Sequence, residues 1–142
     1  MLDTIENLRH RRSLASESGK SVQTLRILVV DDDPMIGALL STMLEALGHS
    51  VCAVASNEID AVKQGIRHKP SLMIVDAWLG AGSGVAAVGQ ILQHGFIPHL
   101  FMSGNIAKVR QLRPDAVLLE KPFKELALIR AIRNALAIPS AT

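Results

Sequence analysis

Five polar residues share one kind of position in this sequence: each stands at or just after the end of a short apolar run. They are Asp31, Asp32, Asp76, Ser103 and Lys121. Carboxylate oxygens are the ligands that Mg²⁺ prefers in proteins. A carboxylate held beside a metal ion and an ammonium group can also attack phosphorus as a nucleophile. The pattern therefore indicates magnesium-dependent chemistry on a phosphoryl group.

The apolar runs have the length and composition of buried β-strands. We predict strands at 25–30, 50–55, 71–75, 98–102 and 116–119. Apolar residues at helical spacing predict helices over 34–47, 57–68, 85–94 and 125–137. Strands that alternate with helices form a parallel sheet with helices on both faces. Because the carboxyl ends of such strands open into one crevice, we expect the five polar residues to meet there.

Local signals mark the helix ends. Asp33 followed by Pro34 is typical of a helix N-cap and first helical position, and Asn57 is a second N-cap candidate. The link 104–115 is short and only weakly patterned, so we expect a short helix or a loop there. The glycine-rich stretch 80–84 lacks the spacing of a dinucleotide-binding loop and is interpreted as a flexible loop rather than a phosphate cradle.

Composition excludes several classes of protein. The chain has 142 residues, of which 49% are hydrophobic and 20% charged, as in a single globular domain. A net charge of +2 and only 3% aromatic residues argue against direct binding of DNA or RNA. The single cysteine, Cys52, excludes an internal disulfide. No apolar run approaches the roughly 20 residues of a membrane span, so we expect a cytoplasmic protein without membrane insertion.

Domain organisation follows from a change in pattern near residue 25. Residues 1–24 are polar and serine-rich, and we interpret them as a flexible or partly helical extension. Residues 25–138 carry the strand–helix alternation and form the expected domain, which leaves 139–142 as a tail.

Four fragments together resemble a two-component response-regulator receiver domain. They are Val29-Val30-Asp31-Asp32-Asp33-Pro34, Ile74-Val75-Asp76, Met102-Ser103-Gly104 and Glu120-Lys121-Pro122-Phe123. The resemblance implies an α/β fold of the flavodoxin-like type, a three-layer sandwich around a five-stranded parallel sheet of order 2-1-3-4-5. The stretch 97–105 is also similar to the Phe-x-Thr-Gly-Tyr subgroup, common among alphaproteobacterial single-domain regulators, in which the fourth helix is reduced or absent.

The resemblance implies a role for each acidic residue. Asp76 would accept a phosphoryl group from the phosphohistidine of a histidine kinase. Asp32, Asp76 and the main-chain carbonyl of Trp78 would bind Mg²⁺ directly, and Asp31 would act through a water molecule. The side chain of Trp78 stands where it would influence the access of hydrolytic water to the acyl phosphate.

The remaining motif residues would contact the phosphoryl group. Ser103 would donate a hydrogen bond to it, and Lys121 would contact one of its oxygens, with the Lys121–Pro122 peptide bond in the cis form. Two positions depart from the family pattern. Leu118 stands where receivers usually have an aromatic switch residue, and Gly80 replaces a proline in the loop after the phosphoacceptor.

These features predict a stand-alone receiver that is phosphorylated on Asp76 and signals through protein–protein contacts. Its partners would be a histidine kinase or phosphotransfer protein and a downstream protein target, with a homodimer left open. It would not be an enzyme beyond the gain and loss of its own phosphoryl group. Two alternatives stay open: a phosphorylation-independent interaction module with the same fold, and a small magnesium-dependent phosphatase.

Overall fold

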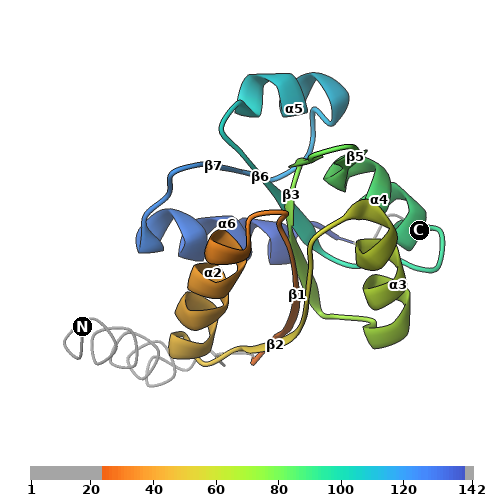
Figure 1. The fold of residues 1–142 in the computed structure, drawn as a ribbon. Helices are drawn as coiled ribbons and strands as arrows, with labels where there is room; N and C mark the ends of the chain where they lie inside the picture. Colours follow the sequence, from red (N-terminus) through yellow and green to blue (C-terminus); the bar gives the residue numbers. More distant parts are fainter. Residues whose placement is uncertain (1–23, 140–142) are drawn as a thin grey trace.

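Five parallel strands form the central sheet of the protein (Figure 1). They are β1 (Arg26–Val30), β2 (Ser50–Ala55), β3 (Leu72–Asp76), β6 (His99–Ser103) and β7 (Leu118–Glu120). Across the sheet they lie in the order β2-β1-β3-β6-β7, with every neighbouring pair parallel. This confirms the predicted strand order. The structure is a computed structural model that describes residues 24–139. The predicted extension before Thr24 and the tail after Pro139 lie outside these residues.

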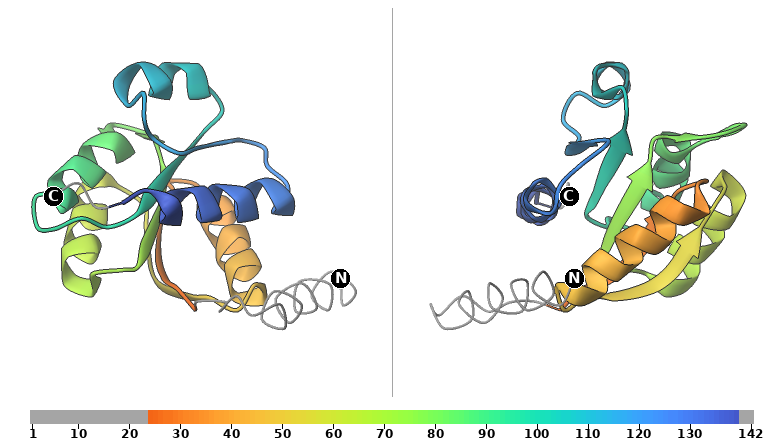
Figure 2. Two further views of the ribbon diagram at one scale, coloured as in Figure 1. Left: turned by 180° about the vertical axis from the view of Figure 1, so that it is seen from behind. Right: turned by 60° about the vertical axis from the view of Figure 1, so that its left-hand side comes forward.

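Within residues 24–139, five helices cover the two faces of the sheet, as the ribbon views show (Figures 1 and 2). They are α2 (Pro34–Ala46), α3 (Glu58–His68), α4 (Gly84–Leu92), α5 (Ile106–Leu112) and α6 (Glu125–Ala137). Helices α2 and α6 pack on one face, whereas α3, α4 and α5 contribute to the core on the other face. The three-layer sandwich inferred from the sequence is therefore confirmed.

The central strands β1, β3 and β6 are buried on both faces because most of their residues are apolar. In β1, Ile27 and Val29 belong to the core under α2 and α6, while Leu28 and Val30 belong to the opposite core. All four side chains have no exposed surface. Burial of one such side chain contributes about 1.5–3 kcal/mol. Because β1 is buried on both faces, its carboxyl end is held in a fixed position.

Capping side chains start the helices where the sequence predicts. Asp33 is the N-cap of α2 and accepts a hydrogen bond from the N–H of Met35 at 2.9 Å, with Pro34 as the first helical residue. Asn57 is the N-cap of α3 and accepts from the N–H of Asp60 at 2.8 Å. Both predicted caps are confirmed.

Two connections carry more regular structure than the sequence indicates. The link after β6 contains α5, a helix of seven residues, so the short-helix alternative holds. The stretch after β3, interpreted as a flexible loop, forms an antiparallel hairpin of β4 (Trp78–Leu79) and β5 (Gly82–Ser83). Gly80 has a φ of 59° in this turn, a left-handed conformation that glycine adopts without strain.

Candidate functional site

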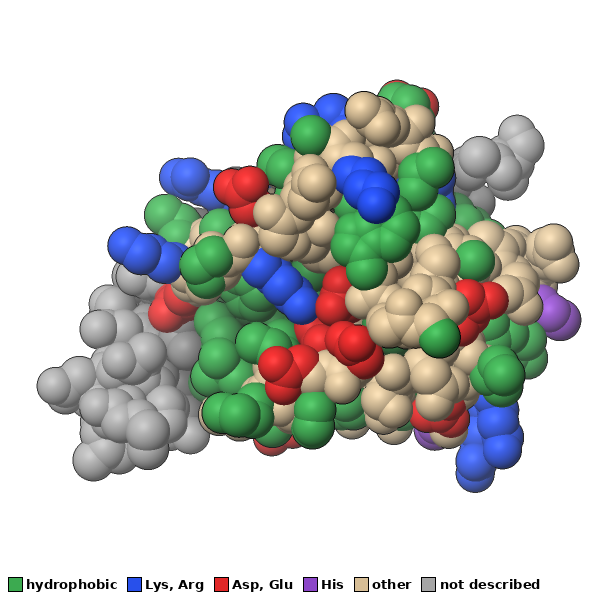
Figure 3. Space-filling view, turned by 45° about the horizontal axis from the view of Figure 1, so that its top comes forward, with side chains coloured by type: hydrophobic (Ala, Val, Ile, Leu, Met, Phe, Trp, Pro, Cys, Tyr) green, Lys and Arg blue, Asp and Glu red, His purple; other side chains and the backbone are tan. Residues whose placement is uncertain are grey.

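Parallel pairing brings the predicted site residues to one edge of the sheet. Asp31 follows the last residue of β1, and Asp76 and Ser103 are themselves the last residues of β3 and β6. Lys121 follows β7, and its backbone N–H donates to the carbonyl of Ser103 at 2.9 Å. On this edge, acidic side chains gather near the centre of the face with a basic side chain beside them (Figure 3). The expected convergence of strand ends is thus present.

Three carboxylates form the acidic part of the site. One oxygen from each of Asp31, Asp32 and Asp76 lies within 4.8 Å of the others. Asp31 is only 1% exposed and Asp76 only 7%, whereas the side chain of Asp32 is exposed. Oxygen ligands converging at this spacing, one of them open to solvent, have the chemistry that suits Mg²⁺. The residues present therefore fit the ion that the sequence implies.

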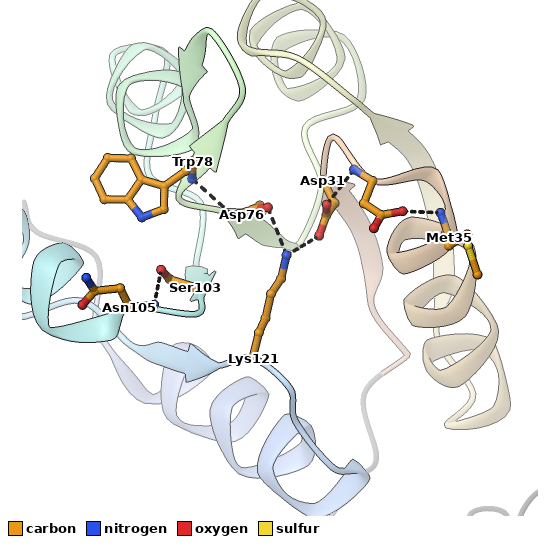
Figure 4. Close-up of polar contacts among 8 residues, drawn as sticks. Asp31, Met35, Asp76, Trp78, Ser103, Asn105 and Lys121 are labelled. Atoms are coloured by element: carbon orange, nitrogen blue, oxygen red, sulfur yellow. Dashed lines mark hydrogen bonds and ion pairs between the residues drawn. The ribbon is translucent and has the colours of Figure 1, made fainter.

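Lys121 joins the two buried carboxylates (Figure 4). Its Nζ lies 2.9 Å from Oδ2 of Asp31 and 3.0 Å from Oδ2 of Asp76. Burial by itself lowers the pKa of Lys121, but the hydrogen bonds and negative charges of the two aspartates outweigh it, so this pKa lies above its ordinary value. The lysine is therefore a fixed positive charge. The cluster contains one ammonium group and three carboxylates, so it keeps an excess of negative charge.

The carboxylate of Asp76 has a partner for each of its oxygens. Oδ1 accepts a hydrogen bond from the N–H of Trp78 at 3.2 Å, and Oδ2 accepts from Lys121. Burial raises the pKa of Asp76, while the hydrogen bonds from Lys121 and Trp78 oppose that rise, and the nearby charge of Asp31 adds to it. Burial also keeps this carboxylate less hydrated than one on the surface, which makes it a better nucleophile.

Each oxygen of the Asp31 carboxylate also accepts a hydrogen bond. Its Oδ1 accepts a hydrogen bond from the N–H of Asp33 at 2.9 Å, and its Oδ2 accepts from Lys121. The hydrogen bond to Asp33 fixes the turn between β1 and α2. Asp32 lies within that turn, so the same bond places the exposed carboxylate at the mouth of the site.

Ser103 lies on the side of the site toward α5. It is 2% exposed, and its Oγ accepts a hydrogen bond from the N–H of Asn105 at 2.9 Å. Figure 4 shows the Ser103 hydroxyl, the Asn105 side chain and the Trp78 ring on the same side of Asp76. Asn105 is the N-cap of α5 and accepts from the N–H of Lys108 at 3.3 Å. Ser103 thus lies two residues before the N-cap of α5 and is hydrogen-bonded to it.

Two supporting residues were missed in the sequence. Glu58, the first residue of α3, accepts a hydrogen bond from the N–H of Ser83 at 2.9 Å and one from Gln90 at 3.2 Å. It therefore ties the hairpin after Asp76 to α3. A Cβ on Gly84 would lie 1.9 Å from the carbonyl oxygen of Asp76, so only glycine fits there. Neither residue stands in a local pattern that points to these contacts.

The core beside the site includes Leu118, which departs from the family pattern, and Trp78. Leu118 is half-buried and packs against the core formed under α3, α4 and α5. Trp78 is half-buried against the same core, and the Nζ of Lys108 lies 4.9 Å from the centre of its ring. The peptide bond between Lys121 and Pro122 is cis, as the resemblance implies.

Comparison with known proteins agrees with this geometry. Residues 27–133 match the family model described as the response regulator receiver domain. The chain belongs to the response-regulator receiver family. A receiver is a domain of two-component signalling, and the similar proteins include bacterial response regulators. No helix within residues 24–139 has the length and apolar character needed to cross a membrane.

The similar proteins include several receivers of one type. The chain is 33% identical over 132 residues to the phyllosphere-induced regulator PhyR of Methylorubrum extorquens, covering 88% of this chain and 49% of that protein. The receiver domain of PhyR from Erythrobacter litoralis superimposes with a TM-score of 0.75 at 28% identity, covering 84% of this chain and 97% of that one. The anti-anti-sigma factor PhyR of Bartonella quintana gives 0.71 at 26% identity, covering 92% and 54%. This chain therefore spans about half the length of the full PhyR proteins that it matches.

Proposed function

We propose that this receiver accepts a phosphoryl group on Asp76 from a histidine kinase or a phosphotransfer protein, and that the phosphorylated form signals through protein–protein contacts. The observation that carries the proposal is the position of Lys121, whose ammonium group bridges the two buried carboxylates at 2.9 and 3.0 Å. A buried carboxylate with a fixed cation and two further acidic groups beside it combines a nucleophile with charge stabilisation.

The transfer step follows from these positions. An oxygen of the Asp76 carboxylate forms a bond to phosphorus, the bond between phosphorus and the donor's imidazole nitrogen breaks, and that nitrogen keeps the electron pair. Lys121 moves its hydrogen bond from the carboxylate to a phosphoryl oxygen. The Ser103 hydroxyl donates to another oxygen of the same group. Both residues start within the same strand-end cluster, so the transfer needs only small movements of side chains.

Mg²⁺ belongs to this proposal as the counter-ion of the acidic cluster. Asp32, Asp76 and the main-chain carbonyl of Trp78 would hold it directly, and Asp31 would act through a water molecule. Bound there, the ion would neutralise charge on the phosphoryl oxygens. Lys121 already occupies one oxygen each of Asp31 and Asp76, which leaves the exposed Asp32 as the carboxylate best placed to meet an incoming ion.

The downstream target is proposed as a protein. PhyR of Bartonella quintana, to which this chain is similar, is an anti-anti-sigma factor, and this similarity supports a protein as the target. Phosphorylation can bias a two-state surface near the site, and α5 together with α6 flanks the edge strand β7 beside that site (Figure 2). Contact with a second copy of this chain is the other form that this output could take.

The test is intact-protein mass spectrometry after incubation with acetyl phosphate, with and without Mg²⁺. We expect the wild type to gain one phosphoryl group only with Mg²⁺, and Asp76→Asn to gain none. Asp60→Asn is the matched control, since Asp60 lies in α3 outside the acidic cluster, and it should be labelled like the wild type. Equal labelling of Asp76→Asn and the wild type would show that the site assignment is wrong.

A further inference from the structure

Trp78 connects the phosphoacceptor to a second element of the fold. Its backbone N–H donates to Oδ1 of Asp76 at 3.2 Å, and its ring lies under the ammonium group of Lys108, with Nζ 4.9 Å from the ring centre. Lys108 belongs to α5, 30 residues further along the chain. Trp78 therefore connects, through its backbone on one side and its ring on the other, the carboxylate that would carry the phosphoryl group to the helix α5.

Helix α5 buries little of its own surface against the domain. Val109 is the one buried residue of this seven-residue helix. At its start, the N–H of Asn105 donates to the Oγ of Ser103 at 2.9 Å, which fixes the helix to the end of β6. The Lys108 ammonium over the Trp78 ring is a second link to the site. A cation–π contact at an exposed site contributes about 0.5–1 kcal/mol, which adds to the attachment of a helix with one buried residue.

The usual route from the site to this helix is altered in this chain. Receivers commonly use an aromatic residue on the last strand, where Leu118 stands here, and Leu118 packs half-buried in the core. A leucine side chain has no polar group, so it cannot form a hydrogen bond near Ser103. The Trp78–Lys108 contact joins the same two regions by different atoms.

We propose that Lys108 is a positioning residue that acts through Trp78: it holds the indole beside Asp76 and so lengthens the lifetime of the acyl phosphate. The inference rests on the proposed function, because it concerns the loss of the phosphoryl group from Asp76. In that step a water oxygen bonds to phosphorus, the bond between phosphorus and the Asp76 oxygen breaks, and inorganic phosphate leaves with the protons of water. An indole fixed at the side of Asp76 excludes that water.

The contact also couples the lifetime to the position of α5. If the placement of α5 affects the phosphorylated site, phosphorylation affects α5 by the same coupling free energy. A partner protein that binds α5 and takes Lys108 away from the ring would then shorten the lifetime of the signal. This coupling between α5 and the phosphorylated site requires only that the Lys108 side chain move.

The experiment measures loss of the phosphoryl group from protein labelled with acetyl phosphate and Mg²⁺ and then freed of the donor. We expect Lys108→Met, which keeps the length of the side chain but not its charge, to lose the group about two- to fivefold faster than the wild type, the size of a solvent-exposed cation–π contact. Lys108→Arg should restore a lifetime within twofold of the wild type, because a guanidinium also stacks on indole. Arg110→Met, an exposed cation on the same helix, is the matched control and should leave the lifetime unchanged.

Two further readouts separate positioning from a general structural effect. Trp78 is the one tryptophan of the chain, which has no tyrosine, so intrinsic emission reports on its ring. Lys108→Met should alter this emission and Arg110→Met should not. In a Trp78→Asn background, Lys108→Met should cause no further acceleration.

Each contrary result has a distinct meaning. Labelled Lys108→Met with the lifetime of the wild type would overturn the inference and leave the proposed function intact. An equal acceleration with and without Trp78 would show that Lys108 acts independently of the ring, which also overturns it. Absence of label on the wild type itself would overturn the proposed function, and the inference with it.

Discussion

The ammonium group of Lys121 lies 2.9 Å from a carboxylate oxygen of Asp31, a residue 90 positions earlier in the chain. The same ammonium group reaches Asp76 at 3.0 Å, 45 positions away. Three segments that are distant in sequence are therefore joined at one nitrogen atom. Asp31 has no exposed side-chain surface, so removal of the lysine would leave a buried carboxylate without its cation.

We therefore expect Lys121→Met to destabilise the protein when no metal is added. The free energy of unfolding should fall by about 1–3 kcal/mol, the cost of leaving a buried charged group without a partner. Urea unfolding at low ionic strength measures this change. Lys124→Met is the matched control, because Lys124 is exposed and makes no side-chain capping bond to α6. Equal midpoints for the two variants would show that the bridge does not stabilise the fold.

Asp32 provides a separate test of the metal site. Changes to residues that only support metal ligands already weaken affinity about 10–100-fold, so loss of a direct ligand in Asp32→Asn should weaken Mg²⁺ binding at least tenfold. Without Mg²⁺ the variant should be more stable than the wild type, because one of three crowded negative charges is gone. Titration calorimetry measures the affinity and thermal unfolding measures the stability.

Asp33→Asn is the control for Asp32→Asn. Asparagine caps a helix as well as aspartate does, so this variant removes a neighbouring charge while keeping the N-cap of α2. We expect a much smaller loss of Mg²⁺ affinity than for Asp32→Asn. If both variants lose the same affinity, long-range charge rather than ligation explains the binding.

Replacement of glycine by alanine should have opposite effects on stability at two positions of α4. Gly84→Ala would place a Cβ 1.9 Å from the carbonyl oxygen of Asp76, a backbone atom that cannot move without disturbing β3. We expect a loss of about 3 kcal/mol or more in the free energy of unfolding. Gly89→Ala meets no atom within 4 Å and should add about 0.5–1 kcal/mol, because alanine favours the helix. Chemical denaturation of both variants gives the comparison, and a stable Gly84→Ala protein would contradict the packing at Asp76.

The sequence was sufficient for the sheet and for the residues at its edge, because both depend on rules that act within short segments. An apolar run marks a buried strand, and parallel strands place Asp31, Asp76 and Ser103 at one edge. The contacts of Glu58 with Ser83 and Gln90 join residues 25 and 32 positions apart and leave no local pattern. The two-residue strands of the hairpin at Trp78 are likewise too short for a periodicity. Contacts of this kind depend on tertiary packing alone.

The buried histidine at the start of β6 predicts a pH dependence of stability. His99 is enclosed by Phe96, Phe101 and the Arg113 guanidinium. Its Nδ1 donates to the carbonyl of Ile97 at 2.8 Å, and its Nε2, 3.1 Å from Arg113, accepts from that cation. Burial lowers the pKa of His99 from its ordinary value of 6.5, the Ile97 carbonyl opposes this and the charge of Arg113 adds to it. The native state therefore favours the neutral ring.

A lowered pKa means that the unfolded chain binds this proton more readily than the native protein does. The contribution of His99 to the free energy of unfolding is then fully present above the unfolded pKa of 6.5. It is lost progressively as the pH drops from there toward the lowered pKa of the native state. The slope for this one group is at most about 1.4 kcal/mol per pH unit. In urea unfolding between pH 7.5 and 5.5, His99→Gln should lose less stability than the wild type, since glutamine does not titrate. His94→Gln, at an exposed position, should behave like the wild type, and a wild-type slope in His99→Gln would assign the effect to another group.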